Sequence, residues 1–134
     1  MNFSELINHR NEHNVFAKYI NVTNLDISEG YAKAVMIITE NHYNIHGTIH
    51  GGALFSLADI VAGSAASSRG EKTNTLDASV YFIAPGIETN KIYAEAGEAK
   101  KGRTIRLYDV NLYNEKDQPL LKGVFSFFVR DERD

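Results

Sequence analysis

One segment, residues 52–68, is almost free of charge, and it constrains the fold more than any other feature of the sequence. Of its seventeen residues, eleven are Gly, Ala or Ser, five are large and apolar, and one is Asp59. The pair Arg69-Gly70 that follows suits a helix end, so the segment is predicted to be an α-helix. A helix on the surface of a domain has a polar face, and this one has none. We therefore expect it to be buried on most sides.

The rest of the chain predicts strands around this helix. After Gly70 the apolar residues follow a period of two, and the turns between the later runs are short, which favours antiparallel pairing. A strand of a dozen residues spans about 40 Å, more than the roughly 26 Å of the helix, so such a sheet can curl around it. The prediction is an α+β fold, one central helix against one antiparallel sheet, with strands at residues 19–27, 31–40, 76–83, 91–100, 103–114 and 120–130.

Length and composition favour a single domain over residues 1–134. The formal charge of −3 argues against a general nucleic-acid binder, which needs a basic face. Without cysteine there is no disulfide, no thiolate zinc site and no cysteine nucleophile. Residues 4–20 have a weakly helical pattern in which Ser4 can cap the first turn, and residues 1–18 are expected to form an N-terminal helical segment. This segment lacks the apolar stretch of a secretory signal, and no run is long enough to span a membrane, so we expect a cytoplasmic protein.

Asp59 is the anomaly of the predicted helix. Its helical neighbours at three and four positions on either side are Phe55, Ser56, Ala62 and Gly63, none of which is basic. Aspartate is almost never fully buried without a partner. One interpretation is structural, with the side chain facing solvent or a lysine from a strand. The other is functional, with Asp59 as a general base or nucleophile at the wall of a cleft, where perturbed carboxylates concentrate.

Two glycines, Gly51 and Gly52, stand where the helix begins. First-turn N–H groups have no acceptor within a helix, and glycine lets a ligand oxygen approach them, so this turn is a candidate oxyanion site, although packing also explains such glycines. Gly51 and Asp59 are eight residues apart, about 12 Å along a helix, so one helix cannot bring both groups to one carbonyl. If both function, a second subunit must supply one of them, and a symmetric dimer would hold two sites at its interface.

The pattern Asn44-x-x-Gly47-x-x-His50-Gly51-Gly52-x6-Asp59 resembles the hotdog-fold thioesterases of the PaaI/acyl-CoA thioesterase 13 type, over about residues 20–130. The resemblance implies a hotdog fold, in which a curved sheet of five to six strands wraps a long central helix. It also implies dimers that pair into homotetramers, and hydrolysis of an acyl-CoA, with an aromatic or medium-chain acyl group, without cofactor or metal.

The resemblance assigns roles by position. Asp59 matches the acid that activates the attacking water or attacks the thioester itself, and the N–H of Gly51 matches the oxyanion donor. His50 shapes the same turn, and Asn44 matches the loop asparagine near the thioester. Thr75 falls where relatives use a serine or threonine to orient the water.

The expected substrate-binding residues lie elsewhere in the chain. Lys101, Gly102 and Arg103 form a turn that is suited to the phosphates of CoA, and Gly52 of the helix turn is a further expected substrate-binding residue. Solvated charges at a hairpin tip are the alternative for the cations of the turn, which applies best to Lys100. The last residues of this set, Phe55 and Tyr81, are candidates to line an acyl pocket.

Two other functions remain open from the sequence. A hotdog hydratase or dehydratase needs a histidine and an acid at the reacting carbons, and His50 is available for it. A non-catalytic acyl-CoA binding module would not need the carboxylate of Asp59. A zinc site of His42, His46 and His50 is not expected, because Gly47 interrupts any helix that could align them.

Overall fold

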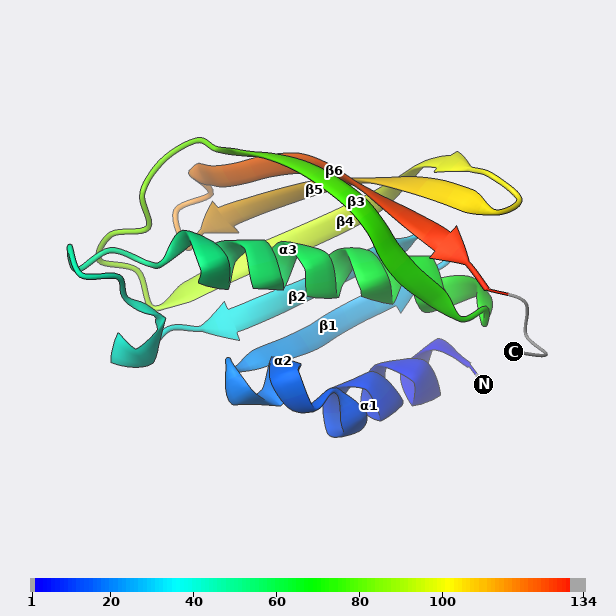
Figure 1. Cartoon of the computed structure of the whole chain (residues 1–134). Helices are drawn as coiled ribbons and strands as arrows, with labels where there is room; N and C mark the ends of the chain where they lie inside the picture. The colour runs from blue at the N-terminus through cyan, green and yellow to red at the C-terminus, as the bar shows by residue number, and fades with distance from the viewer. Residues whose placement is uncertain (1, 131–134) are drawn as a thin grey trace.

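The structure of the chain is a computed structural model that describes residues 2–130; residue 1 and residues 131–134 of the predicted domain lie outside this range. A six-stranded sheet curls around one long helix (Figure 1). The elements are α1 (Phe3–His13), α2 (Val15–Tyr19), β1 (Val22–Ser28), β2 (Tyr31–Ile37), η1 (Glu40–His42), α3 (Gly51–Ala66), η2 (Ser67–Arg69), β3 (Thr73–Phe82), β4 (Lys91–Lys101), β5 (Ile105–Asn114) and β6 (Pro119–Val129).

All neighbouring strands are antiparallel, in the order β1-β2-β4-β5-β6-β3. The predicted α+β fold and the meander of the last three strands are therefore confirmed. β3 does not continue the sequence order of the sheet, because it pairs with β6 and forms the edge opposite β1. A bulge at Leu76 interrupts that pairing between Thr75 and Asp77.

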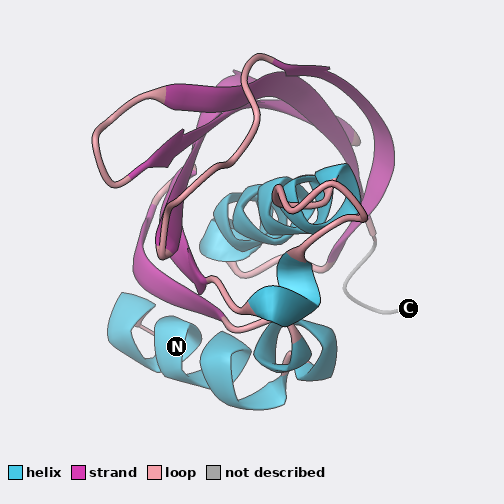
Figure 2. Ribbon diagram, turned by 90° about the vertical axis from the view of Figure 1, so that its left-hand side faces the viewer, coloured by secondary structure: helices cyan, strands magenta, loops and turns pink. Residues whose placement is uncertain are grey.

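Helix α3 lies in the hollow of the sheet, which Figure 2 shows almost along the helix axis. More than half of its residues are buried, which confirms the expectation from its composition. The helix begins one residue earlier than predicted. A short 3-10 turn, η2, prolongs it, and Gly70 ends it with a φ of 84°, the left-handed conformation expected of a glycine after a helix.

The N-terminal segment is two helices, not one, because Asn14 ends α1 and caps α2 by accepting a hydrogen bond from Ala17 N. Ser4 is not the cap of α1. Asn2 takes this role, and its Oδ1 accepts from Glu5 N at 2.8 Å. The two helices lie along β1 at the open side of the curved sheet (Figures 1 and 2). None of the helices within residues 2–130 is long and apolar enough to cross a bilayer.

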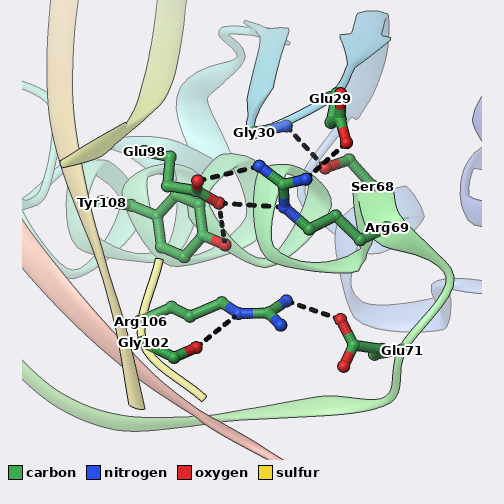
Figure 3. A network of polar contacts seen from close by, with 9 residues as sticks. All are labelled: Glu29, Gly30, Ser68, Arg69, Glu71, Glu98, Gly102, Arg106 and Tyr108. Atoms are coloured by element: carbon green, nitrogen blue, oxygen red, sulfur yellow. Dashed lines mark hydrogen bonds and ion pairs between the residues drawn. The ribbon is translucent and has the colours of Figure 1, made fainter. Parts of the chain in front are cut away.

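A polar cluster closes the C-terminal end of α3 (Figure 3). The guanidinium of Arg69 donates to both carboxylate oxygens of Glu98, at 2.9 and 3.3 Å, and pairs with Glu29. Its hydrogen bonds hold the pKa of Glu98 below the usual 4.5. Tyr108 Oη also donates to Glu98, and burial raises the pKa of Tyr108 to about 12.

A second arginine lies beside this cluster. Arg106 is 3% exposed, its Nε donates to Gly102 O at 3.1 Å, and its Nη1 lies 2.7 Å from Glu71 Oε1 (Figure 3). The N–H direction of Nη1 misses the carboxylate, so this contact is an ion pair and not an aligned hydrogen bond. We call these residues the Arg69–Arg106 network. It joins the helix end to the β1–β2 turn and to the β4–β5 hairpin, with the members Glu29, Arg69, Glu71, Glu98, Arg106 and Tyr108.

Candidate active site

The first turn of α3 leaves one backbone donor available. His50 caps the helix, since its Nδ1 accepts a hydrogen bond from Gly52 N at 2.8 Å and its carbonyl accepts from Ala53 N and Leu54 N. The N–H of Gly51 has no acceptor among residues 2–130. It lies at the positive end of the helix dipole, which suits an oxygen that gains negative charge.

Asn44 holds the loop that leads into this turn. Its Oδ1 accepts from His46 N and Thr48 N, and its Nδ2 donates to Thr48 Oγ1 at 2.8 Å. Gly47, at φ 80°, completes the turn. In one protomer the Asn44 side chain is therefore committed to the loop conformation that positions His50.

Asp59 is half-buried on the face of α3 that the sheet leaves open, and it has a hydroxyl partner. Thr75 Oγ1 donates to Asp59 Oδ1 at 2.7 Å. Thr75 comes from edge strand β3, next to its bulge, so the fold brings together two residues that the resemblance assigned to one task. The neighbours of Asp59 on its own helix contribute no such donor.

The structure also places a cation near Asp59 that the sequence did not indicate. Arg10 of α1 lines the same small cavity, of about 190 Å³, as Asp59 and Thr75. Burial lowers the pKa of Arg10, and the negative charge of Asp59 offsets part of this effect. Helical spacing in the sequence could not reveal that Arg10 lies near Asp59, because the two residues lie on different helices and are far apart in sequence.

The two halves of the predicted site do not meet within one chain. His50 and Gly52 line a cavity of about 510 Å³ with Phe16 and Tyr19 of α2. This cavity shares no lining residue with the Asp59 cavity. Each half is accessible, but the helix holds them about 12 Å apart, as its rise requires.

The predicted CoA-binding turn is the exposed tip of the β4–β5 hairpin. Lys101 and Arg103 are exposed, and neither takes part in an ion pair within residues 2–130. A Cβ at Gly102 would lie only 1.9 Å from Ile105 O, so the hairpin needs a glycine there. The buried Arg106, in contrast, faces inward and is used by Glu71.

Phe55 and Tyr81, the candidates for an acyl pocket, lie on different surfaces of one protomer. The ring of Phe55 packs against Phe125 on the concave side of the sheet, with centroids 5.4 Å apart. Tyr81 is 74% exposed and lines a shallow cavity on the outer face with Asp109 and Lys122. One chain therefore does not form a single pocket from both.

His42, the first of the three histidines considered as zinc ligands, has a structural role. His42 is buried, its Nδ1 accepts from Thr39 N at 3.0 Å, and its Nε2 lies 2.7 Å from Ile20 O, so the ring connects its loop to the end of α2. In the described part of the chain, no three or more His, Asp or Glu side chains are grouped as metal ligands.

Comparison with known proteins gives consistent matches. Residues 46–120 match the thioesterase superfamily. The chain is 33% identical, over 101 residues, to a putative esterase of Archaeoglobus fulgidus, in an alignment that covers 74% of this chain and 66% of the relative. It is 29% identical, over 107 residues, to the acyl-coenzyme A thioesterase PaaI of Escherichia coli, with 80% and 76% covered.

Solved structures agree. The structure of Escherichia coli PaaI superposes with a TM-score of 0.91 over 96% of this chain and 93% of that one, at 24% identity. A hypothetical thioesterase from Streptococcus pneumoniae, solved with coenzyme A, has a TM-score of 0.79 and 25% identity, with 85% and 89% covered. These superpositions confirm the hotdog fold that the resemblance implied.

Proposed function

Since this chain belongs to the thioesterase superfamily, and so to a family of thioester hydrolases, we propose that it releases CoA from an acyl-CoA whose acyl group is aromatic or medium-chain. In the proposed site, Asp59 is the general base or nucleophile, and the N–H of Gly51 of the partner subunit is the oxyanion donor. The name of the Escherichia coli relative and the coenzyme A in the Streptococcus pneumoniae structure support CoA as the carrier.

One observation supports the two-subunit site: Asp59 lines one cavity, His50 and Gly52 of the first turn line another, and Asp59 and Gly51 are about 12 Å apart along one helix. In a dimer with α3 antiparallel to its copy, each Asp59 would approach the first turn of the other helix. The residues on the same face of α3 are small, which allows close approach. They are Gly52 and Ser56.

The chemistry follows from the groups available. Thr75 donates to one oxygen of Asp59, which leaves the other oxygen to take a proton from water or to attack the carbonyl carbon directly. The carbonyl oxygen becomes negative as the new bond forms, and the N–H of Gly51 stabilises it; one such donor is worth about 2.7–4 kcal/mol. The CoA thiolate then leaves with the electrons of the C–S bond. In the base route it takes up the proton that Asp59 removed from water, and in the nucleophile route water hydrolyses the mixed anhydride left on Asp59 to the free acid.

Lys101, Gly102 and Arg103 are proposed to dock the phosphates of CoA. The two cations are exposed at a hairpin tip and are not neutralised by carboxylates in the described chain. Phosphate binding by exposed cations weakens as salt screens the charges. The KM for acyl-CoA is therefore expected to rise with ionic strength.

His50 favours hydrolysis over hydration. A hydratase needs a histidine aimed at the substrate, and Nδ1 of His50 is already used by Gly52 N in capping α3. The third candidate function is an acyl-CoA binding module without catalysis. An activity assay distinguishes it from the two enzymatic functions.

The decisive assay is thiol release from short, medium, long, phenylacetyl and hydroxybenzoyl CoA thioesters by wild type and by Asp59→Asn. We expect wild type to hydrolyse at least one class and the variant to lose at least about 100-fold in kcat, as for loss of a general base. Equal rates for both proteins would remove Asp59 from the mechanism, and no release by wild type would support a binding module.

Shared sites are tested by co-expressing Asp59→Asn and His50→Ala chains, each of which is expected to be inactive alone. A mixed dimer would hold one intact site of two, so random pairing should restore roughly a quarter of wild-type activity. No recovery in dimers shown to be mixed, or full activity of a monomer in gel filtration, would place the whole site in one chain.

A further inference from the structure

The Asp59 cavity contains a second charged side chain, Arg10, to which the proposed mechanism gives no role. Arg10 lies near the end of α1, outside the residues that match the thioesterase superfamily. Of the described residues that line the cavity, Arg10 and Asp59 carry the charges. The others are hydroxyls, amides and apolar groups.

Arg10 is anchored by buried partners. Its Nε donates to Ser64 Oγ at 2.9 Å, and Ser64 Oγ donates in turn to Asn24 Oδ1 at 2.6 Å. Ser64 is fully buried and Asn24 is 3% exposed. The next residue, Asn11, exchanges further hydrogen bonds with Asn24, at 2.8 to 3.1 Å. The arginine side chain therefore has a defined direction, because a buried polar chain holds its stem.

That direction leads toward the reactive face of α3. Arg10 Nη2 lies 3.4 Å from the point where a Cβ of residue 63 would be, and Gly63 is one helical turn after Asp59. The glycine leaves room for the guanidinium beside the helix. Both charged groups then border one cavity together with Thr75.

Among residues 2–130, no carboxylate is directly bound to the guanidinium of Arg10. Within residues 2–130 the ion pairs involve Arg69 and Arg106, and no carboxylate lies within 4 Å of Arg10. Withdrawing a cation from water is costly unless an opposite charge compensates it. Asp59 is the carboxylate whose charge acts on Arg10, across a cavity with room for several water molecules.

We propose that Arg10 is a positioning residue for the reaction: its charge attracts the Asp59 carboxylate across the cavity and, with the Thr75 hydroxyl, holds it in one orientation. The inference rests on the proposed function of Asp59. A carboxylate held in one orientation is what either role requires, as base or as nucleophile. Because Arg10 acts through Asp59, it should affect turnover and not affinity for acyl-CoA.

The test is a double-mutant cycle on thiol release with Arg10→Gln, Asp59→Asn and the double variant. We expect Arg10→Gln to lower kcat about tenfold with KM within about twofold. Arg10→Lys should recover most of the loss, since it restores the charge. On the residual rate of Asp59→Asn, Arg10→Gln should have no further effect.

Asn2→Ala is the matched control, because it removes the N-cap of α1 and leaves both the charge of Arg10 and its anchor through Ser64 and Asn24 in place. It should lower the melting temperature and leave kcat of the folded protein unchanged. If Arg10→Gln unfolds the chain, Arg10→Lys still tests the proposal. A wild-type kcat of Arg10→Lys would support a role for the charge, and a tenfold loss of kcat would overturn it.

The inference fails alone if Asp59→Asn is inactive while Arg10→Gln has wild-type kcat, if the Lys variant recovers nothing, or if Arg10→Gln is equally harmful in the Asp59→Asn background. If Asp59→Asn is fully active, the proposed function of Asp59 fails as well.

Discussion

Two regions of the molecule each place arginine next to carboxylate, and they do so in opposite ways. In the Arg69–Arg106 network, each guanidinium has a carboxylate oxygen at 2.9 Å or closer, and the network links α3 to three other segments. In the Asp59 cavity, Arg10 and Asp59 share a space but no direct bond. Charges that neutralise one another hold structure together. A carboxylate left partly unpaired keeps an oxygen free for chemistry.

The comparison predicts that substitutions in the network change stability and leave kcat alone, whereas substitutions in the cavity do the reverse. The largest effect is expected for Arg106→Ala, because this buried side chain joins Glu71 to Gly102 O. We expect the free energy of unfolding to fall by about 3 kcal/mol, measured by urea denaturation. A large loss of kcat in the protein that remains folded would connect the network to the active site and break the comparison.

The next largest effect is expected for Glu98→Gln. It removes the charge that Arg69 and Tyr108 bind, at an expected cost of about 2 kcal/mol at neutral pH. The pKa of Glu98 is lowered in the folded chain, so its stabilising contribution is complete above about 4.5 and is lost as the pH falls further. The difference in unfolding free energy between wild type and variant should therefore shrink in acid. A constant difference down to about pH 3 would contradict the charge interaction.

Thr75→Val tests the second region of the comparison, the Asp59 cavity. The substitution keeps the shape of the residue and removes the donor to Asp59 Oδ1, so kcat for thiol release should fall about tenfold. Thr75 is exposed, so the melting temperature should hardly change. Thr73→Val, in the same cavity but without a hydrogen bond to Asp59, is the control and should keep wild-type kcat. Equal losses in both variants would mean that the cavity wall matters and the hydroxyl does not.

The smallest effect is expected for Lys101→Gln, because a single exposed cation contributes little. The KM for acyl-CoA should rise about twofold at low salt, and the difference should disappear in high salt. Lys100→Gln serves as the comparison. A rise in KM for Lys100→Gln but not for Lys101→Gln would reverse the assignment of the hairpin cations.

Much of the fold was predictable because its signals are local. The uncharged composition of residues 52–68 predicted a buried helix, and short turns predicted the meander of β4, β5 and β6. The position of β3 beside β6 was not predictable, since alternation along a strand does not name its neighbour. The choice of Asn2 over Ser4 as cap depends on where the first turn begins, which propensity leaves open to within a few residues.

The candidate site was likewise predictable only in part. The pattern from Asn44 to Asp59 indicated the family, which the matches to the thioesterase superfamily and to PaaI confirm. The hydrogen bond between Thr75 and Asp59 follows from the family position of Thr75, not from periodicity. Arg10 was missed because its approach to Asp59 depends on how α1 packs against β1 and α3, and nothing in the local sequence records that packing.

The order of strands in the sheet has a consequence for synthesis of the chain. β3 leaves the ribosome soon after α3, but its pairing partner β6 is made only after β4 and β5. Until then the apolar helix is covered incompletely, and β3 offers an unpaired edge to other nascent chains. Because β3 pairs with β6 alone, Thr75 is expected to reach its final place beside Asp59 only when β6 docks, so the proposed catalytic pair is assembled late in folding.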